Sequence, residues 1–162
     1  MKTVLITNKR DNITNDFQYK EYWKGRDFEI YACIPKAIQI LRDYYGLKIS
    51  ITSSYRPNDP VYMPDAHRKT PPAVDCVTTD RTKWAEIRDK IREEFKNWMT
   101  SKLVKDIINT GTNVMIIENT CLHLHHRKAN LHQTNQYGGI YIGEWKPDGK
   151  AGVNTAYSFP TI

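Results

Sequence analysis

An aspartate stands in the middle of an apolar run, Ala73-Val74-Asp75-Cys76-Val77. Short apolar runs of this kind are typical of buried strands. Burying a carboxylate is costly unless it is hydrogen-bonded, paired with a charge or bound to a metal. The fold must therefore bring a partner to Asp75, unless the residue lies at a strand end and accepts backbone hydrogen bonds.

Histidines are the candidate partners. His123 and His125 stand two apart in a second apolar run, Cys121-Leu122-His123-Leu124-His125. On a strand both side chains, with that of Cys121, leave the same face. His67 precedes Asp75 in a proline-rich segment. One Asp and two His residues match an open zinc site, in which three protein ligands leave a position for water. A polar, solvent-facing sheet edge is the alternative for His123 and His125, and an exposed, inert loop histidine is the alternative for His67.

Composition is ordinary for a folded protein. The chain has 162 residues, 40% apolar residues and 26% charged residues, which suits one domain with its own core. We expect a single domain over 1–162. Its three cysteines are few and widely spaced, which favours a reducing compartment over a disulfide framework.

Net charge and hydropathy limit the expected binding partners and cellular location of the protein. A net charge of +6 favours polyanionic partners such as nucleic acid or anionic cell-wall polymers, although a basic protein without such a partner is an equal alternative. The apolar run in residues 1–10 is too short for a signal peptide, and no stretch is long enough to span a membrane. We therefore expect cytoplasmic synthesis without export, no membrane contact and a monomer.

Periodicity predicts an α+β fold, with helices on one face of a small, mostly antiparallel sheet. Helical spacing of apolar residues covers 33–45, 84–98 and 103–108, and Gly46 and Asp80 are placed to end and to begin helices. The predicted strands are 47–53, 73–77, 114–118 and 121–125. Residues 54–72 form a long loop. Residues 1–30 form a lead-in strand or an N-terminal arm, and residues 128–162 form a C-terminal extension with a hairpin.

The order of these parts resembles the hedgehog/D-alanyl-D-alanine-peptidase zinc fold, and the resemblance implies a peptidase-like core over 33–127. That family shows Ser-Gly-Tyr-Arg, then Ser-x-His-x-x-Gly-x-Ala-x-Asp, and later a His on a strand. The matching segments are Ser53-Ser54-Tyr55-Arg56, the stretch from Asp65 to Asp75, and His123-Leu124-His125. Asp65 replaces the family serine, the family glycine is missing, and the interval from His67 to Asp75 is one residue longer.

The resemblance implies roles for individual residues. It assigns zinc to His67, Asp75 and His125, with His123 supporting a ligand or the transition state; the reverse assignment of the two histidines stays open. Many members carry an acid three residues before the last ligand, where this chain has Thr120 or Leu122. Glu118 is the nearest upstream carboxylate and the candidate general base, with Asp65 as the second candidate. Arg56 is the candidate group for binding an oxyanion or a substrate carboxylate.

Three functions follow as hypotheses. The leading one is a zinc-dependent peptidase, a carboxypeptidase or endopeptidase, that cleaves short peptidoglycan-type peptides; a phage-encoded enzyme released at lysis would suit the missing export signal. The second is a catalytically inactive zinc-bearing binding domain of the same fold. The third, a nucleic-acid-associated basic protein, rests on charge and aromatic content alone and ranks last.

Overall fold

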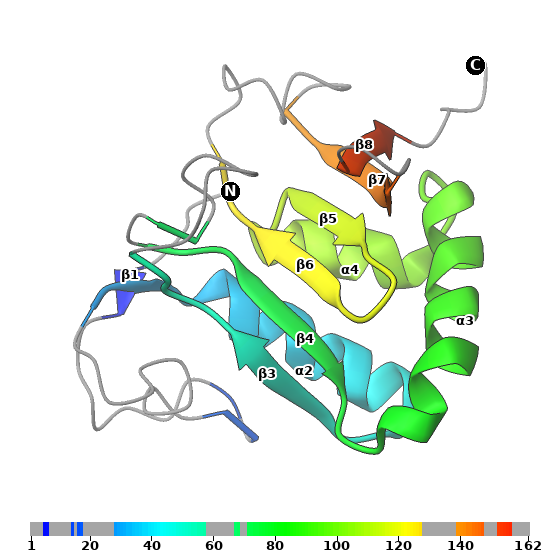
Figure 1. Cartoon of the computed structure of the whole chain (residues 1–162), viewed down its shortest axis with the longest axis horizontal. Helices are drawn as coiled ribbons and strands as arrows, with labels where there is room; N and C mark the ends of the chain where they lie inside the picture. Colours follow the sequence, from blue (N-terminus) through cyan, green and yellow to red (C-terminus); the bar gives the residue numbers. More distant parts are fainter. Residues whose placement is uncertain are drawn as a thin grey trace.

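The computed structural model describes residues 5–6, 14, 16–17, 28–57, 67–68, 71–127, 139–147 and 152–156. Its main sheet has six strands in the order β3-β4-β6-β5-β7-β8 (Figure 1). These strands are β3 (Ile49–Ser53), β4 (Val74–Thr78), β5 (Val114–Ile117), β6 (Leu122–His125), β7 (Tyr141–Pro147) and β8 (Gly152–Ala156). A separate antiparallel pair joins β1 (Leu5–Ile6) to β2 (Ile30–Tyr31).

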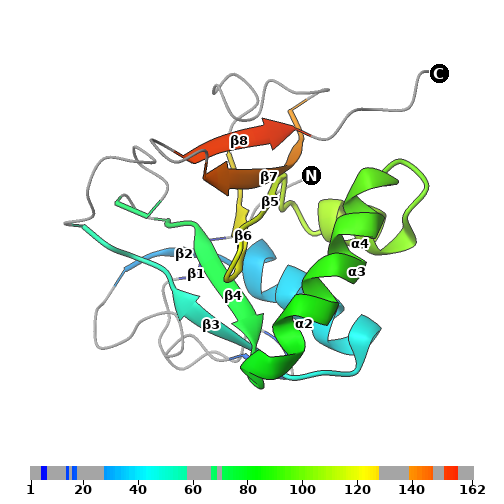
Figure 2. The same cartoon turned by 45° about the vertical axis from the view of Figure 1, so that its right-hand side comes forward.

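Among the described residues, three α-helices accompany the sheet: α2 (Cys33–Tyr45), α3 (Trp84–Lys96) and α4 (Lys102–Asn109). A short 3-10 helix, η1 (Arg81–Lys83), precedes α3. Figure 2 shows the three helices gathered on one side of strands β3, β4 and β6. Every pairing in the main sheet is antiparallel except that of β5 with β7. The predicted class, α+β with a mostly antiparallel sheet, is confirmed.

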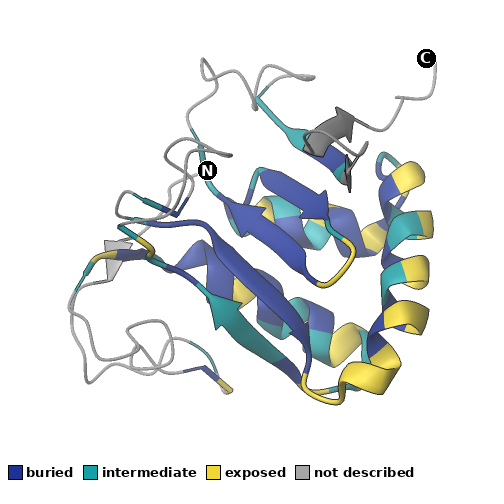
Figure 3. Cartoon of the chain, in the orientation of Figure 1, coloured by how far each residue is buried: buried dark blue, intermediate teal, exposed yellow. Residues whose placement is uncertain are grey.

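The two faces of the sheet differ in character. One face belongs to the helix-packed core and carries, from three neighbouring strands, Val74, Met115, Ile117, Leu122 and Leu124. Because side chains alternate along a strand, the other face carries Asp75, Ile116 and His123. Strands β4, β5 and β6 are buried on both faces (Figure 3). The polar side chains on the second face are therefore enclosed rather than exposed to solvent.

Helix α2 follows the sequence pattern closely. Its buried residues include Ile34, Ile38 and Leu41, which recur on one face. The helix ends at Gly46, whose φ of 63° is left-handed, and the Gly46 N–H donates to the carbonyl of Arg42 at 2.8 Å. Glycine suits this position because a side chain raises the energy of left-handed backbone.

The other helices begin at side-chain caps. The Asp80 carboxylate accepts a hydrogen bond from the backbone N–H of Thr82 and begins η1, as predicted. Ser101 accepts from Val104 N at 3.1 Å and begins α4. The structure corrects some bounds: the helix predicted to run to Trp98 ends at Lys96, and the strand predicted from residue 47 begins at 49. These are shifts at element ends, where side-chain periodicity carries least information.

Several predictions fall outside the described residues. Asp65 lies there, as do most of the predicted arm at 1–30 and most of the loop at 54–72. The predicted C-terminal hairpin corresponds to the antiparallel pair β7–β8, of which the structure describes both strands but not the turn. None of the described helices is long and apolar enough to cross a membrane.

Replacing Gly46 tests the helix end. A Cβ built at this position meets nothing within 4 Å, so only the backbone conformation opposes a side chain. Gly46→Ala should lower the free energy of unfolding by about 1 kcal/mol in urea titrations. Gly46→Asn is the control and should cost less, because asparagine tolerates left-handed backbone. Equal stability of all three proteins would contradict the assigned cap.

Candidate metal centre

The register of the central strands places Asp75 beside a histidine. Asp75 of β4 pairs with His123 of β6, and on the far side His123 pairs with Ile116 of β5. Directly opposed residues of an antiparallel pair point to the same face. The two side chains therefore meet, and the His123 Nδ1 lies 3.0 Å from the Asp75 Oδ1.

His67 reaches the same carboxylate from the long loop. Its Nε2 lies 3.4 Å from the Asp75 Oδ2. The strand register shifts between Ile51 and Ser53, an irregularity of the β-bulge kind, and the chain then presents the Ser54 carbonyl to the His67 Nδ1 at 2.8 Å. The backbone N–H of Arg56 also donates to the His67 carbonyl at 2.6 Å. Two backbone contacts thus hold this histidine in place.

The three side chains form a compact donor set. One ligand atom from each of His67, Asp75 and His123 lies within 4.8 Å of the others, and all three residues are buried. In a tetrahedral zinc site with bonds of 2.0–2.1 Å, neighbouring ligand atoms are about 3.3 Å apart. The two His–Asp distances, 3.4 and 3.0 Å, are close to that separation. This set could hold a metal ion with little movement.

Counting protons shows that a proton or a metal ion must lie between His67 and Asp75. A carbonyl only accepts, so the His67 Nδ1 must carry its proton toward Ser54. In the neutral ring the Nε2 then has a lone pair, which faces the Asp75 carboxylate. Two acceptors this close repel unless a proton or a metal ion lies between them. A backbone carbonyl that fixes the tautomer in this way is the usual support of a metal-binding histidine.

Electrostatics keep Asp75 ionised. Burial raises its pKa, but the hydrogen bonds from His123 and His67, and their positive charges when protonated, outweigh burial. The net result is a pKa well below the ordinary value for an aspartate. An ionised carboxylate is the form that binds a metal.

His125 occupies a different environment from His123. Arg127 can only donate, so its Nε donates to the His125 Nδ1 at 3.2 Å, and the His125 Nε2 faces the Pro71 carbonyl at 3.4 Å. Both ring nitrogens thus have protein partners. The His123 Nε2, by contrast, is buried without a hydrogen-bond partner among the described residues. His123, and not His125, belongs to the donor set with His67 and Asp75. This favours the open alternative of the sequence analysis, with His123 as the ligand.

The candidate general base lies next to this group. Glu118 follows β5 directly, and its carboxylate lies within 4.8 Å of ligand atoms of both Asp75 and Cys121. The Cys121 thiol donates to the Glu118 Oε2 at 2.7 Å, and the two backbones are joined by a hydrogen bond at 2.9 Å. Burial, and then the charges of Asp75 and Glu118, raise the pKa of the Cys121 thiol. Without a bound cation it is therefore a neutral donor.

The remaining predicted residue, Arg56, is exposed, and its backbone takes part in fixing His67. Sequence reasoning gave no role to Cys121, although its spacing from His123 showed that they share a face. It also gave none to the carbonyl of Ser54 or to Arg127. A contact made by a backbone atom cannot be predicted from the residue type. A contact between distant segments also produces no periodic pattern in the sequence.

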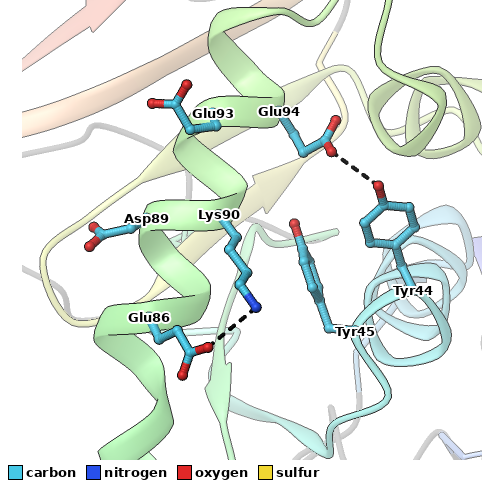
Figure 4. A pocket seen from close by; sticks show the side chains of 7 residues that line it. All are labelled: Tyr44, Tyr45, Glu86, Asp89, Lys90, Glu93 and Glu94. Atoms are coloured by element: carbon cyan, nitrogen blue, oxygen red, sulfur yellow. Dashed lines mark hydrogen bonds and ion pairs between the residues drawn. The ribbon is translucent and has the colours of Figure 1, made fainter.

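A separate groove lies between α2 and α3 (Figure 4). Tyr44 and Tyr45 line one side of it, and acidic residues of α3 line the other. Each acid has a partner in the protein: Glu86 pairs with Lys90, Asp89 with Arg92, Glu93 with Lys96, and Glu94 with Tyr44 and Ser101. These contacts satisfy the charges of the groove internally, which is typical of a solvated helix face.

Comparison with known proteins gives no relative: no protein-family model, no curated protein and no solved structure matches this chain. The chemistry of the site therefore rests on its own residues.

A matched pair of variants separates the two histidines. His123→Gln should weaken zinc binding by more than about tenfold, because it removes a ligand. His125→Gln, two residues along the same buried strand, should change the affinity much less. Isothermal titration with Zn²⁺ gives both constants, and a zinc-induced rise in thermal stability gives an independent check. The opposite ranking would return the ligand role to His125.

Proposed function

We propose that this protein is a zinc-dependent peptidase that cleaves short peptidoglycan-type peptides, as its resemblance to the hedgehog/D-alanyl-D-alanine-peptidase fold implies. One observation carries the proposal. A buried carboxylate, Asp75, lies between nitrogens of His67 and His123 at 3.4 and 3.0 Å, with a second carboxylate, Glu118, beside it. Ligands and a neighbouring acid are the parts that metal-assisted hydrolysis requires.

The donor set suits zinc. Two imidazole nitrogens and one carboxylate oxygen form a three-ligand set that, in catalytic zinc sites, leaves a position for water or substrate. Magnesium and calcium instead prefer oxygen ligands alone. Zinc bound in such a set lowers the pKa of water to about 7 and polarises the carbonyl of a peptide. The chain's own residues must supply the proton transfers.

Glu118 is the residue that we assign to proton transfer. It is half-buried and lies close to Asp75. The hydrogen bond from Cys121 occupies its Oε2 and orients the carboxylate. In the proposed reaction, Glu118 accepts a proton from the attacking water and delivers it to the amine of the leaving group.

Arg56 is the candidate group for substrate binding. It follows β3 directly, at the segment whose backbone holds His67. A guanidinium can bind a carboxylate through two parallel hydrogen bonds. In this proposal it binds either the free carboxylate of the peptide or the oxyanion of the transition state.

Glu118→Gln tests the assigned base. The variant should lower kcat on synthetic peptidoglycan stem peptides by about 10²–10⁴-fold, because the amide cannot accept the proton. The first equivalent of zinc should still bind, since Glu118 is not among the His67–Asp75–His123 ligands. Chelator treatment of the native protein should abolish cleavage, and added zinc should restore it.

Three other results of these experiments would each contradict a different part of the proposal. Zinc binding without cleavage of any stem peptide would favour the inactive binding domain of the same fold. A native protein that binds no zinc, even after reconstitution, would contradict both zinc hypotheses. Full activity of Glu118→Gln would move the base elsewhere, and Asp65→Asn would then be the next variant.

Arg56→Lys separates binding of the carboxylate from binding of the oxyanion. Lysine keeps the charge but loses the two-pronged geometry. If Arg56 binds the substrate carboxylate equally in the ground and transition states, KM should rise with kcat nearly constant. If it binds the oxyanion, kcat should fall instead. Wild-type kinetics in this variant would contradict both roles.

A further inference from the structure

A second group of metal-binding atoms adjoins the first and shares one residue with it. One ligand atom from each of Asp75, Glu118 and Cys121 lies within 4.8 Å of the others. We call these three residues the second cluster. Asp75 belongs to both groups, so the two lie on the same face of the central strands.

The second cluster has an excess of negative charge. Asp75 has His67 and His123 beside it, but Glu118 has no Lys, Arg or His partner among the described residues; its contacts there are with Cys121. A partly buried carboxylate without a countercharge is costly. The hydrogen bond from a thiol compensates it only weakly, because S–H is a weak donor. A cation at this position would relieve the imbalance.

The donors define the kind of cation. A cysteine sulfur with carboxylate oxygens selects a borderline or soft metal, such as zinc or cadmium, over magnesium or calcium. On binding, the thiol proton leaves to solvent and the sulfur becomes a ligand. Ions that share a carboxylate in two-metal sites lie about 3.5–4 Å apart, and Asp75 has the two oxygens that such sharing requires.

We propose that Asp75, Glu118 and Cys121 bind a second zinc ion, and that this ion inhibits the enzyme by occupying Glu118. The second ion should bind more weakly than the first, because two cations on one carboxylate repel each other. Inhibition follows because a coordinated Glu118 cannot accept a proton. The inhibitory part rests on the proposed function, whereas binding of the ion does not depend on it.

Cobalt reports the second site independently of activity. Titration of the metal-free full-length chain with Co²⁺ should show a thiolate-to-cobalt charge-transfer absorption only as the second equivalent binds, because the His67–Asp75–His123 group contains no sulfur. Cys121→Ser should lose this absorption and weaken the second ion by at least about tenfold, while the first equivalent still binds. Cys33→Ser is the matched control; Cys33 is buried but belongs to neither group, and its variant should keep the absorption.

Several outcomes would overturn the inference. Absence of the absorption at any cobalt concentration excludes sulfur ligation. An absorption that saturates at a single equivalent would mean one mixed site instead of two. If Cys121→Ser does not fold, as judged by circular dichroism, Glu118→Gln serves in its place and should also lose the second equivalent.

Zinc dependence of activity tests the inhibitory part. Cleavage of a stem peptide should rise to a maximum at about one equivalent of zinc and fall at higher concentrations. In Cys121→Ser the ratio of activity at excess zinc to activity at the maximum should return toward one. Binding of two ions without this fall would overturn inhibition alone, whereas a protein that cleaves nothing but binds two ions would contradict only the proposed function.

Discussion

The charge of Asp75 organises the centre of this molecule. A carboxylate buried on a central strand would destabilise the fold without compensation, and both of its oxygens face histidine nitrogens. One histidine comes from the neighbouring strand and the other from a loop, so compensation of a single charge joins three segments. Removing either histidine would leave a buried anion with half of its partners, which costs more than the lost contact itself.

Regular strands hold two residues of this centre, and an irregular segment holds the third. Strands β4 and β6 hold Asp75 and His123 in fixed register, buried on both faces. His67 does not lie on a strand, so hydrogen bonds with the backbone atoms of Ser54 and Arg56 hold it in place instead. The bulge in β3 stands just before those residues. Irregular pairing next to a site often serves to redirect the chain in this way.

Much of this arrangement could be predicted from side-chain patterns. The helix at 33–45, its end at Gly46 and the four strands of the core follow from periodicity, because one buried face imposes it. The parallel pairing of β5 with β7 was not predicted, since the sequence of residues 126–140, between β6 and β7, does not indicate which strand the chain will pair with next. The choice between His123 and His125 was equally beyond the sequence, because both leave the same face. The choice depends on which residues contact each ring, and the two ring nitrogens of His125 contact Pro71 and Arg127.

The strand order has a consequence for how the protein folds. Asp75 and His123 are paired across 48 residues of chain, so the ligands come together only after both central strands have joined. Because the entropy of closing so long a loop is lost before its contacts form, we expect this pairing to be a slow step of folding. A metal ion would find no assembled site in the unfolded chain and would bind the finished sheet. We therefore expect a bound metal ion mainly to lower the rate of unfolding, with little effect on the rate of folding.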